Sequence, residues 1–282
     1  MRVTSWRELD DAIGEASRDD GATYAHSTMV FRGLSRSSYS HVSGLARLEG
    51  DYAALESHLL RNFRKYAHRQ EPGATIWDWL ALGQHHGLPT RLLDWTFSPL
   101  VALHFATASW PEEDGLLVAL DCAGAHRLLP VPLRKRLDEE GALVFTTEIL
   151  AEFAPDLPCF DRLSEKEPFL AFFEPPSLDE RVVNQSSVLS AFSDPGYQLG
   201  DWMAEHPDLW RAWCIPAEVK VEIRQRLDQA NITERVLLPG LDGLAEWLRR
   251  YYSPGGIGRG KGDGGATMSG DERNRHYNDM NE

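Results

Sequence analysis

The segment from residue 75 to residue 106 constrains the fold most, because it contains the signals that end one helix and begin another. A Thr-x-x-Asp cap begins a helix at Thr75, and Gly87, followed by a proline two residues later, ends it. Ser98 and the proline after it provide the N-cap and the first position of a second helix. Residues 90–95 form a short extended stretch between the two. The chain therefore mixes helices and strands.

Hydrophobic spacing extends this prediction along the rest of the chain. Behind a Ser-x-x-Glu cap, Trp6, Leu9 and Ile13 recur at helical spacing and predict a helix over residues 5–17. A β-prone run over residues 28–31 places Arg32 at a strand end. Residues 130–176 are rich in Pro, Asp and Glu and are interpreted as loops with short helices. Further helices are expected over residues 51–69, 216–229 and 242–252, and further strands over 115–120, 181–192 and 210–215.

We divide the chain into a helical N-terminal extension (residues 1–28), one mixed domain (29–252) and a tail (253–282). The tail is rich in Gly and nearly free of aliphatic residues, so its composition predicts disorder. No apolar run approaches the roughly 20 residues of a membrane span, and no signal-peptide pattern is present at the start. The three cysteines are far apart, so neither a disulfide framework nor a zinc knuckle is indicated. We expect a cytoplasmic protein that does not bind membranes.

The net charge of −14 argues against a general nucleic-acid binder, because a phosphate backbone is repelled at long range. Residues 29–110 differ from the rest of the chain, since they carry a net charge of +2 and six histidines. Such a locally basic segment suits a small anionic ligand better than a polymer. Chance clustering of the charges is the alternative.

Arg32 and Gly33 are the first candidate functional residues. A guanidinium at the end of a buried strand is fixed in place and suits bidentate binding of a phosphate or carboxylate. Gly33 exposes bare backbone, which lets a ligand approach closely. The structural alternative for Arg32 is a salt bridge, for instance to Asp94 or Glu180.

Residues 84–95 contain two imidazoles, a guanidinium, a carboxylate and an indole, and form the second candidate. His85 and His86 lie at a helix end, where the macrodipole favours the protonated imidazole and hydrogen bonds to an anion or a loop carbonyl. Their adjacency differs from the i, i+4 spacing of a helical zinc pair. Asp94 either accepts from a backbone amide or pairs with an arginine. Trp95 either stacks on a planar ring or fills the core. No familiar nucleotide-binding or hydrolase signature is present.

Several of these segments together resemble the FRG domain family, which is named for its N-terminal Phe/Tyr-Arg-Gly motif. The match covers roughly residues 29–250. The resemblance rests on Phe31-Arg32-Gly33, Gln84 to Thr96, Ser98 to Ala106, Arg181 to Gln185 as an Arg-x-x-x-Gln element, and Leu237 to Leu244 as a closing pattern.

A more distant similarity is to ADP-ribosyltransferases, and it implies an α+β domain with a central, mainly antiparallel split sheet flanked by helices. In that similarity Arg32 holds NAD, and the ribose carbon is attacked as a cationic centre develops. Ser187 stands where a transferase has Glu, while Glu174 and Glu180 lie nearby but do not match that position. Asp94 is then the carboxylate available for catalysis. The resemblance assigns catalytic roles to Arg32, His85, Arg91, Asp94 and Gln185, and cofactor contacts to Arg32, Gly33, Gln84, His86, Thr90, Trp95 and Arg181, with no metal ligand.

Three functions follow as hypotheses. The first is an NAD-dependent ADP-ribosyltransferase-like enzyme, with a protein or nucleic-acid acceptor that the sequence does not identify. The second is a non-catalytic module that binds a nucleotide or a partner. The third is a metal-assisted hydrolase that uses His85, His86 and Asp94. Alternatively, the polar motif only holds a helix to a strand.

Overall fold

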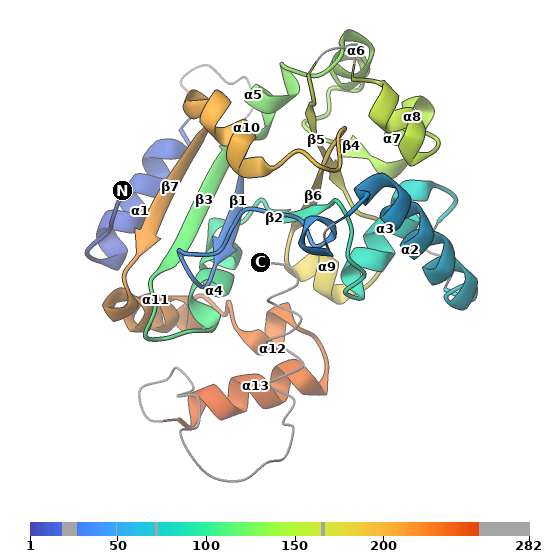
Figure 1. Ribbon diagram of the computed structural model, residues 1–282. Coiled ribbons are helices and arrows are strands. Elements are labelled where there is room, and N and C mark those ends of the chain that lie inside the picture. The colour runs from blue at the N-terminus through green and yellow to red at the C-terminus, as the bar shows by residue number, and fades with distance from the viewer. Residues whose placement is uncertain (19–26, 49, 71–72, 165–166, 254–282) are drawn as a thin grey trace.

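The computed structural model describes residues 1–18, 27–48, 50–70, 73–164 and 167–253, and within them seven strands form one sheet (Figure 1). The order is β4-β5-β6-β2-β1-β3-β7, and all neighbours are antiparallel except the parallel pair β4–β5. This confirms the predicted α+β class with a mainly antiparallel sheet. The strands are β1 (Met29–Leu34), β2 (Leu93–Thr96), β3 (Gly115–Asp121), β4 (Phe145–Thr146), β5 (Leu170–Glu174), β6 (Ser187–Phe192) and β7 (Trp210–Ile215).

The sheet narrows at its centre, between β1 and β2. In the described part of the chain these two strands are paired at one position, Phe31 with Thr96. By contrast, β1 pairs with β3 along its full length, from Met29 to Leu34. The sheet therefore consists of two halves, β4-β5-β6-β2 and β1-β3-β7, joined at a narrow junction. This agrees with the split sheet that the sequence resemblance implied.

Alternating side chains of β1 enter different cores on the two faces of the sheet. Phe31 packs with helices α1 (Trp6–Ala16), α4 (Pro99–Ala108) and α11 (Ala217–Gln229). Val30 packs on the opposite face with α5 (Cys122–His126) and α10 (Leu199–Glu205). Helix α4 begins at the predicted Ser98 cap, whose side chain accepts from the Val101 amide. Because its side chains alternate between the two faces of the sheet, β1 packs against one layer of helices on each face.

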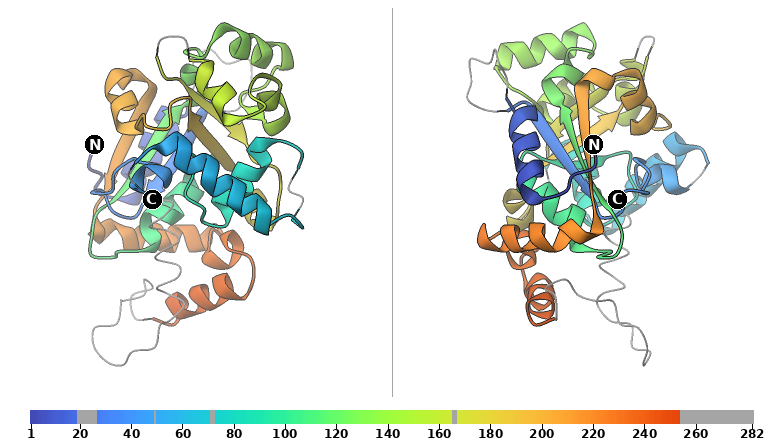
Figure 2. Two further views of the ribbon diagram at one scale, coloured as in Figure 1. Left: turned by 45° about the vertical axis from the view of Figure 1, so that its right-hand side comes forward. Right: turned by 90° about the vertical axis from the view of Figure 1, so that its left-hand side faces the viewer.

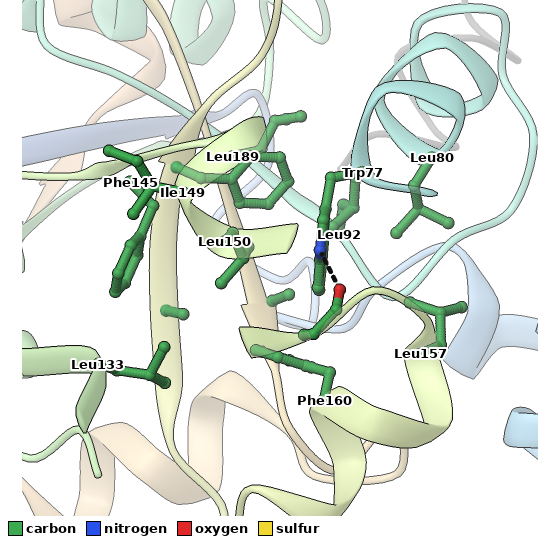
Figure 3. Close-up of a cluster of buried hydrophobic side chains, with 14 of the residues drawn as sticks. Trp77, Leu80, Leu92, Leu133, Phe145, Ile149, Leu150, Leu157, Phe160 and Leu189 are labelled. Atoms are coloured by element: carbon green, nitrogen blue, oxygen red, sulfur yellow. Dashed lines mark hydrogen bonds between the residues drawn. The ribbon is translucent and has the colours of Figure 1, made fainter. Parts of the chain in front are cut away.

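A third core lies under the other half of the sheet (Figure 3). Trp77, on α3 (Ile76–His85), has its indole N–H 2.9 Å from the carbonyl oxygen of Ala154 and meets Phe160 edge to face. Helix α3 has the predicted capping box of Thr75 and Asp78 and ends before Gly87, whose φ is +80°. The helices around this core are α2 (Tyr52–Tyr66), α3, α6 (Val131–Glu140), α7 (Thr147–Phe153) and α8 (Leu157–Arg162).

The C-terminal part of the described chain forms helices α12 (Glu234–Leu237) and α13 (Leu241–Tyr251) at one end of the molecule, as Figures 1 and 2 show. Residue 242 lies inside α13, so Asp242 is not the N-cap of this helix as predicted. The N-cap is Gly240, with a φ of +106°.

The tail predicted to be disordered lies outside the described residues except for Ser253. The domain boundaries stay predictions. Among the described residues, no helix is long and apolar enough to cross a membrane.

Three further sequence predictions need correction. The strand predicted over residues 181–192 is helix α9 (Glu180–Asn184) followed by β6, because Asp179 caps the first part as a helix. The region 130–176 contains strands β4 and β5, whose apolar residues are buried rather than placed in covering loops. Arg32 lies inside β1, opposite Val118 of β3, and not at the strand end. Short 3₁₀ helices cover Leu45–Leu48 and Pro207–Leu209.

Acid is expected to destabilise the fold through His126. Its Nε2 accepts from the Phe172 amide at 2.9 Å while Nδ1 lies 3.1 Å from the Leu143 carbonyl, an arrangement that only the neutral ring satisfies. Burial lowers the pKa of His126 from 6.5 to about 4. Below pH 6.5 the unfolded chain therefore binds a proton that the folded chain excludes. Denaturant titrations should show a loss of about 2 kcal/mol from this group between pH 6.5 and 5.

The matched control for this acid sensitivity is His126→Gln, whose amide can both donate and accept but does not titrate. As the pH is lowered from 6.5 to 5, the free energy of unfolding of this variant should fall less steeply than that of the wild type. The difference in slope should correspond to about one proton fewer taken up on unfolding. An unchanged slope in the variant would contradict the assignment to His126.

Candidate functional site

Arg32 marks the junction between the two halves of the sheet. Its Nη1 donates to the backbone carbonyl of Asp94 on β2 at 2.8 Å. The side chain is buried, with 4% of its surface exposed. Asp94 is paired with Leu189 of β6, and β1 and β2 are paired only at Phe31 and Thr96 in the described residues, so this guanidinium adds a second link between β1 and β2. The predicted fixed arginine is therefore present, with one of its nitrogens engaged in holding β2.

Gln84 connects the end of helix α3 to β2. Its Nε2 donates to Oδ2 of Asp94 at 2.9 Å, and its Oε1 accepts from the hydroxyl of Thr90. The same Thr90 oxygen accepts from the Leu92 amide. The helix stop at Gly87 turns the chain so that these polar groups meet. Thr90, predicted to contact a cofactor, is fully buried and orients Gln84 instead.

Helix α9 approaches the same place from the β6 side. Asp179 caps it by accepting from the amides of Arg181 and Val182, and its Oδ2 lies 2.9 Å from Nε2 of His85. Sequence reasoning missed Asp179, although an Asp followed by Glu is a helix-start signal that a helical interpretation of residues 180–184 would have used. His86 is exposed beside His85, with ring centroids 5.2 Å apart.

Asp94 is the electrostatic centre of this arrangement. Loss of hydration raises the pKa of its carboxyl group, while Arg32, the hydrogen bond from Gln84, Arg181 and His85 act in the opposite direction. The pKa of His85 is lowered, chiefly by burial and then by Arg181. These side chains therefore lie within electrostatic reach of one another. We define the Asp94 cluster as Arg32, Gln84, His85, Asp94 and Arg181.

His41 is a neighbour of this cluster that sequence reasoning also missed. Burial, and then the charge of Arg32, lower its pKa to about 4, so the ring is neutral at pH 7. His41 lines a cavity of about 10 Å³ together with Leu93 and Phe192. That volume holds about one water molecule. His41 lies in a loop, outside any helix or strand, so neither helical nor strand spacing relates it to the other candidate residues.

Arg91 does not join the cluster, contrary to its predicted catalytic role. Its Nε lies 2.7 Å from Oε2 of Glu56 on α2, and its Nη1 pairs with Asp161 on α8. The backbone amide of Arg91 also donates to Glu56. Arg91 and Glu56 are almost completely buried. The arginine therefore ties two helices to the start of β2 and is not available to a ligand.

Three further residues have structural contacts that correct their predicted roles. Gly33 faces α4, and a Cβ there would lie 1.8 Å from the carbonyl oxygen of Ala102, so the helix occupies the space expected for a ligand. Trp95 is buried, donates to Ser190 and packs on Phe172, as its core alternative required. Gln185 donates to the carbonyl of Leu237 on α12 rather than facing the cluster.

The carboxylates near Ser187 do not replace a transferase glutamate at that position. Ser187 begins β6 opposite Thr96 and is half-buried. Glu174 ends β5 and Glu180 begins α9, and both are exposed. Within the described residues, no group of three or more His, Cys, Asp or Glu side chains is arranged to hold a metal ion. The donor set needed by the metal-assisted hydrolase is thus not assembled at His85, His86 and Asp94.

Fold and site define an α+β domain in which Asp94, at the junction of the two halves of the sheet, accepts hydrogen bonds from a strand arginine at its backbone carbonyl and from a helix-end glutamine at its carboxylate. Residues 27–115 match the family model of the FRG domain. The comparisons with curated proteins and with solved structures each found no match. They provide no support for the similarity to ADP-ribosyltransferases.

Proposed function

We propose that this FRG-domain protein binds a small anionic nucleotide, NAD, at the Asp94 cluster. The observation that carries the proposal is that Arg32 donates to the backbone carbonyl of Asp94 and Gln84 donates to its carboxylate, while the charges of Arg32 and Arg181 both act to lower the pKa of that carboxylate. The planar guanidinium group of arginine can donate two parallel hydrogen bonds to phosphate oxygens, and this interaction is strong where water is excluded. Arg32 is buried, whereas Arg181 is half-buried. The guanidinium of Arg181 is thus the one of the two that a diphosphate would reach from solvent.

The reaction proposed for this site is transfer of ADP-ribose. The bond between the ribose carbon and the nicotinamide nitrogen breaks, and its electron pair stays on nitrogen, so that nicotinamide leaves as a neutral molecule. A nucleophile of the acceptor forms the new bond to carbon and releases its proton to water. Asp94 would stabilise the positive charge that develops on the sugar. Gln84 would hold that carboxylate in place through its hydrogen bond.

A second candidate, a non-catalytic nucleotide-binding module, is favoured by one specific observation. Ser187 begins the strand that faces β2, and its hydroxyl cannot supply the negative charge of a carboxylate. In this alternative the cluster binds the same ligand without breaking it.

The test is to add NAD to the purified full chain and to measure both the melting temperature and the release of free nicotinamide. At a NAD concentration of about 100 times the dissociation constant, binding should stabilise the fold by about 2.7 kcal/mol, which raises the melting temperature by several degrees. Arg181→Ala should weaken binding by about tenfold or more, because it removes a charge-assisted contact.

The control for the binding test is Arg136→Ala, which removes a half-buried arginine paired with Glu140 and Glu152 away from the cluster. This variant should bind NAD as the wild type does. A temperature rise with nicotinamide release supports the enzyme, and a rise without release supports the module. If NAD changes neither quantity, the proposal is wrong.

A further inference from the structure

Helix α9 carries one of the two arginines of the Asp94 cluster but has little to hold it in place by itself. It spans five residues, Glu180–Asn184, and none of them is buried. A single helical turn is only marginally stable in water without tertiary contacts. The position of Arg181 must therefore depend on groups that hold α9 from outside.

Two sets of hydrogen bonds hold α9, one at each end. At its start, Asp179 caps the helix and pairs with His85. At its end, Nδ2 of Asn184 donates to the carbonyl of Val236 at 2.8 Å, and Nε2 of Gln185 donates to the carbonyl of Leu237 at 2.9 Å. The second set leads away from the cluster and into α12.

Helix α12 is in turn fixed by a buried ionic network. Glu234 accepts hydrogen bonds from Arg224 of α11 and from Arg250 of α13. The glutamate and both arginines are almost completely buried. The hydrogen bond from Arg250 and the charge of Arg224 lower the pKa of Glu234 to about 2, despite its burial, so the network stays charged at neutral pH. Arg250 also binds Asp228 and thereby joins α13 to α11.

We infer that the C-terminal unit α12–α13 controls the ligand site proposed above, with Asn184 and Gln185 as positioning residues that set the place of Arg181. The contacts run without a gap from Arg250 to Glu234, along α12 to the carbonyls of Val236 and Leu237, and through the two amide side chains into α9. The residues of α12 and α13 are far in sequence from Arg32 and Asp94, and they lie beyond the segment 27–115 that matches the family model. The inference rests on the proposed nucleotide binding for its functional part.

The experiment replaces both amide side chains by apolar residues of similar size in the full chain, as Asn184→Leu with Gln185→Met. Hydrogen exchange at the amides of residues 181–184 should become at least about tenfold faster, since two hydrogen bonds that hold this turn are lost. The dissociation constant for NAD should rise by about tenfold. Val183→Ala, a change of an exposed residue on the same helix that makes no such bond, is the control and should alter neither value.

A second comparison separates positioning from general loss of stability. In a background of Arg181→Ala, the double replacement should weaken NAD binding no further, because the group that it positions is gone. Unchanged exchange in α9 would overturn the inference, and so would faster exchange with unchanged NAD affinity. If the wild type does not bind NAD at all, the proposed function fails, whereas the exchange measurement still reports whether α12 holds α9.

Discussion

Gly33→Ala is expected to destabilise the protein by about 3 kcal/mol or more, since it inserts an atom where no space exists. The Cβ would lie 1.8 Å from the carbonyl oxygen and 2.8 Å from the carbonyl carbon of Ala102, and 2.8 Å from the amide nitrogen of Ala106. These are backbone atoms of α4, which cannot rotate away as a side chain can. Relief of the clash requires α4 to move off β1. Chemical denaturation of both proteins measures the loss.

Gly14→Ala is the matched control for this glycine prediction. Gly14 lies in helix α1, and a Cβ there meets nothing within 4 Å. Alanine has the higher helix propensity, so this variant should be about 0.5–1 kcal/mol more stable than the wild type. A Gly33→Ala variant as stable as Gly14→Ala would show that α4 and β1 do not pack as closely as described.

Arg91→Met should cost about 3–5 kcal/mol, because it leaves the buried carboxylate of Glu56 without its partner. Burial raises the pKa of Glu56, and the guanidinium of Arg91 provides the main opposing interaction. Methionine replaces the aliphatic stem of arginine, so the loss reports on the ion pair more than on packing. Guanidinium chloride or urea unfolding at pH 7 measures it. Arg136→Met removes a half-buried arginine from pairs with two partly exposed glutamates and should cost at most about 1 kcal/mol.

A compensating change sharpens the prediction for Arg91. If the penalty comes from the unpaired carboxylate, Glu56→Gln in the Arg91→Met background should restore part of the stability, since it removes the charge while keeping the shape. A double variant less stable than Arg91→Met alone would contradict this explanation.

Local signals in the sequence predicted many elements correctly. The Thr75 cap, the Gly87 stop and the Ser98 start all act within a few residues of the atoms they bind, and each is present in the structure. The strands over residues 115–120 and 210–215 follow from apolar runs of strand length. The same local logic misplaced residues 181–184, because their β-branched valines suggested a strand while the hydrogen bonds of Asp179 support a helical turn.

The spatial grouping of the candidate residues was predicted in part for the same reason. Arg32, Gln84, His85, Asp94 and Arg181 come together as the cluster, and all five stood among the candidates. Arg91 was grouped with them because it is close in sequence, but its partners Glu56 and Asp161 come from helices that are distant in the chain. His41 carries no motif and Asp179 carries only a helix-start signal, so the packing of their segments alone brings them to Arg32 and His85.

The amino-acid sequence by itself determined where the helices around β2 begin and end, which polar residues enter that segment, and the match of residues 27–115 to the FRG domain model. Caps, breakers and hydrophobic periods suffice for this, because they act between neighbours in the chain. Only the tertiary structure decided which arginine is structural and which faces Asp94, and that α4 fills the space above Gly33. Burial and charge pairing depend on segments far apart in sequence, and their energies exist only after the chain has packed.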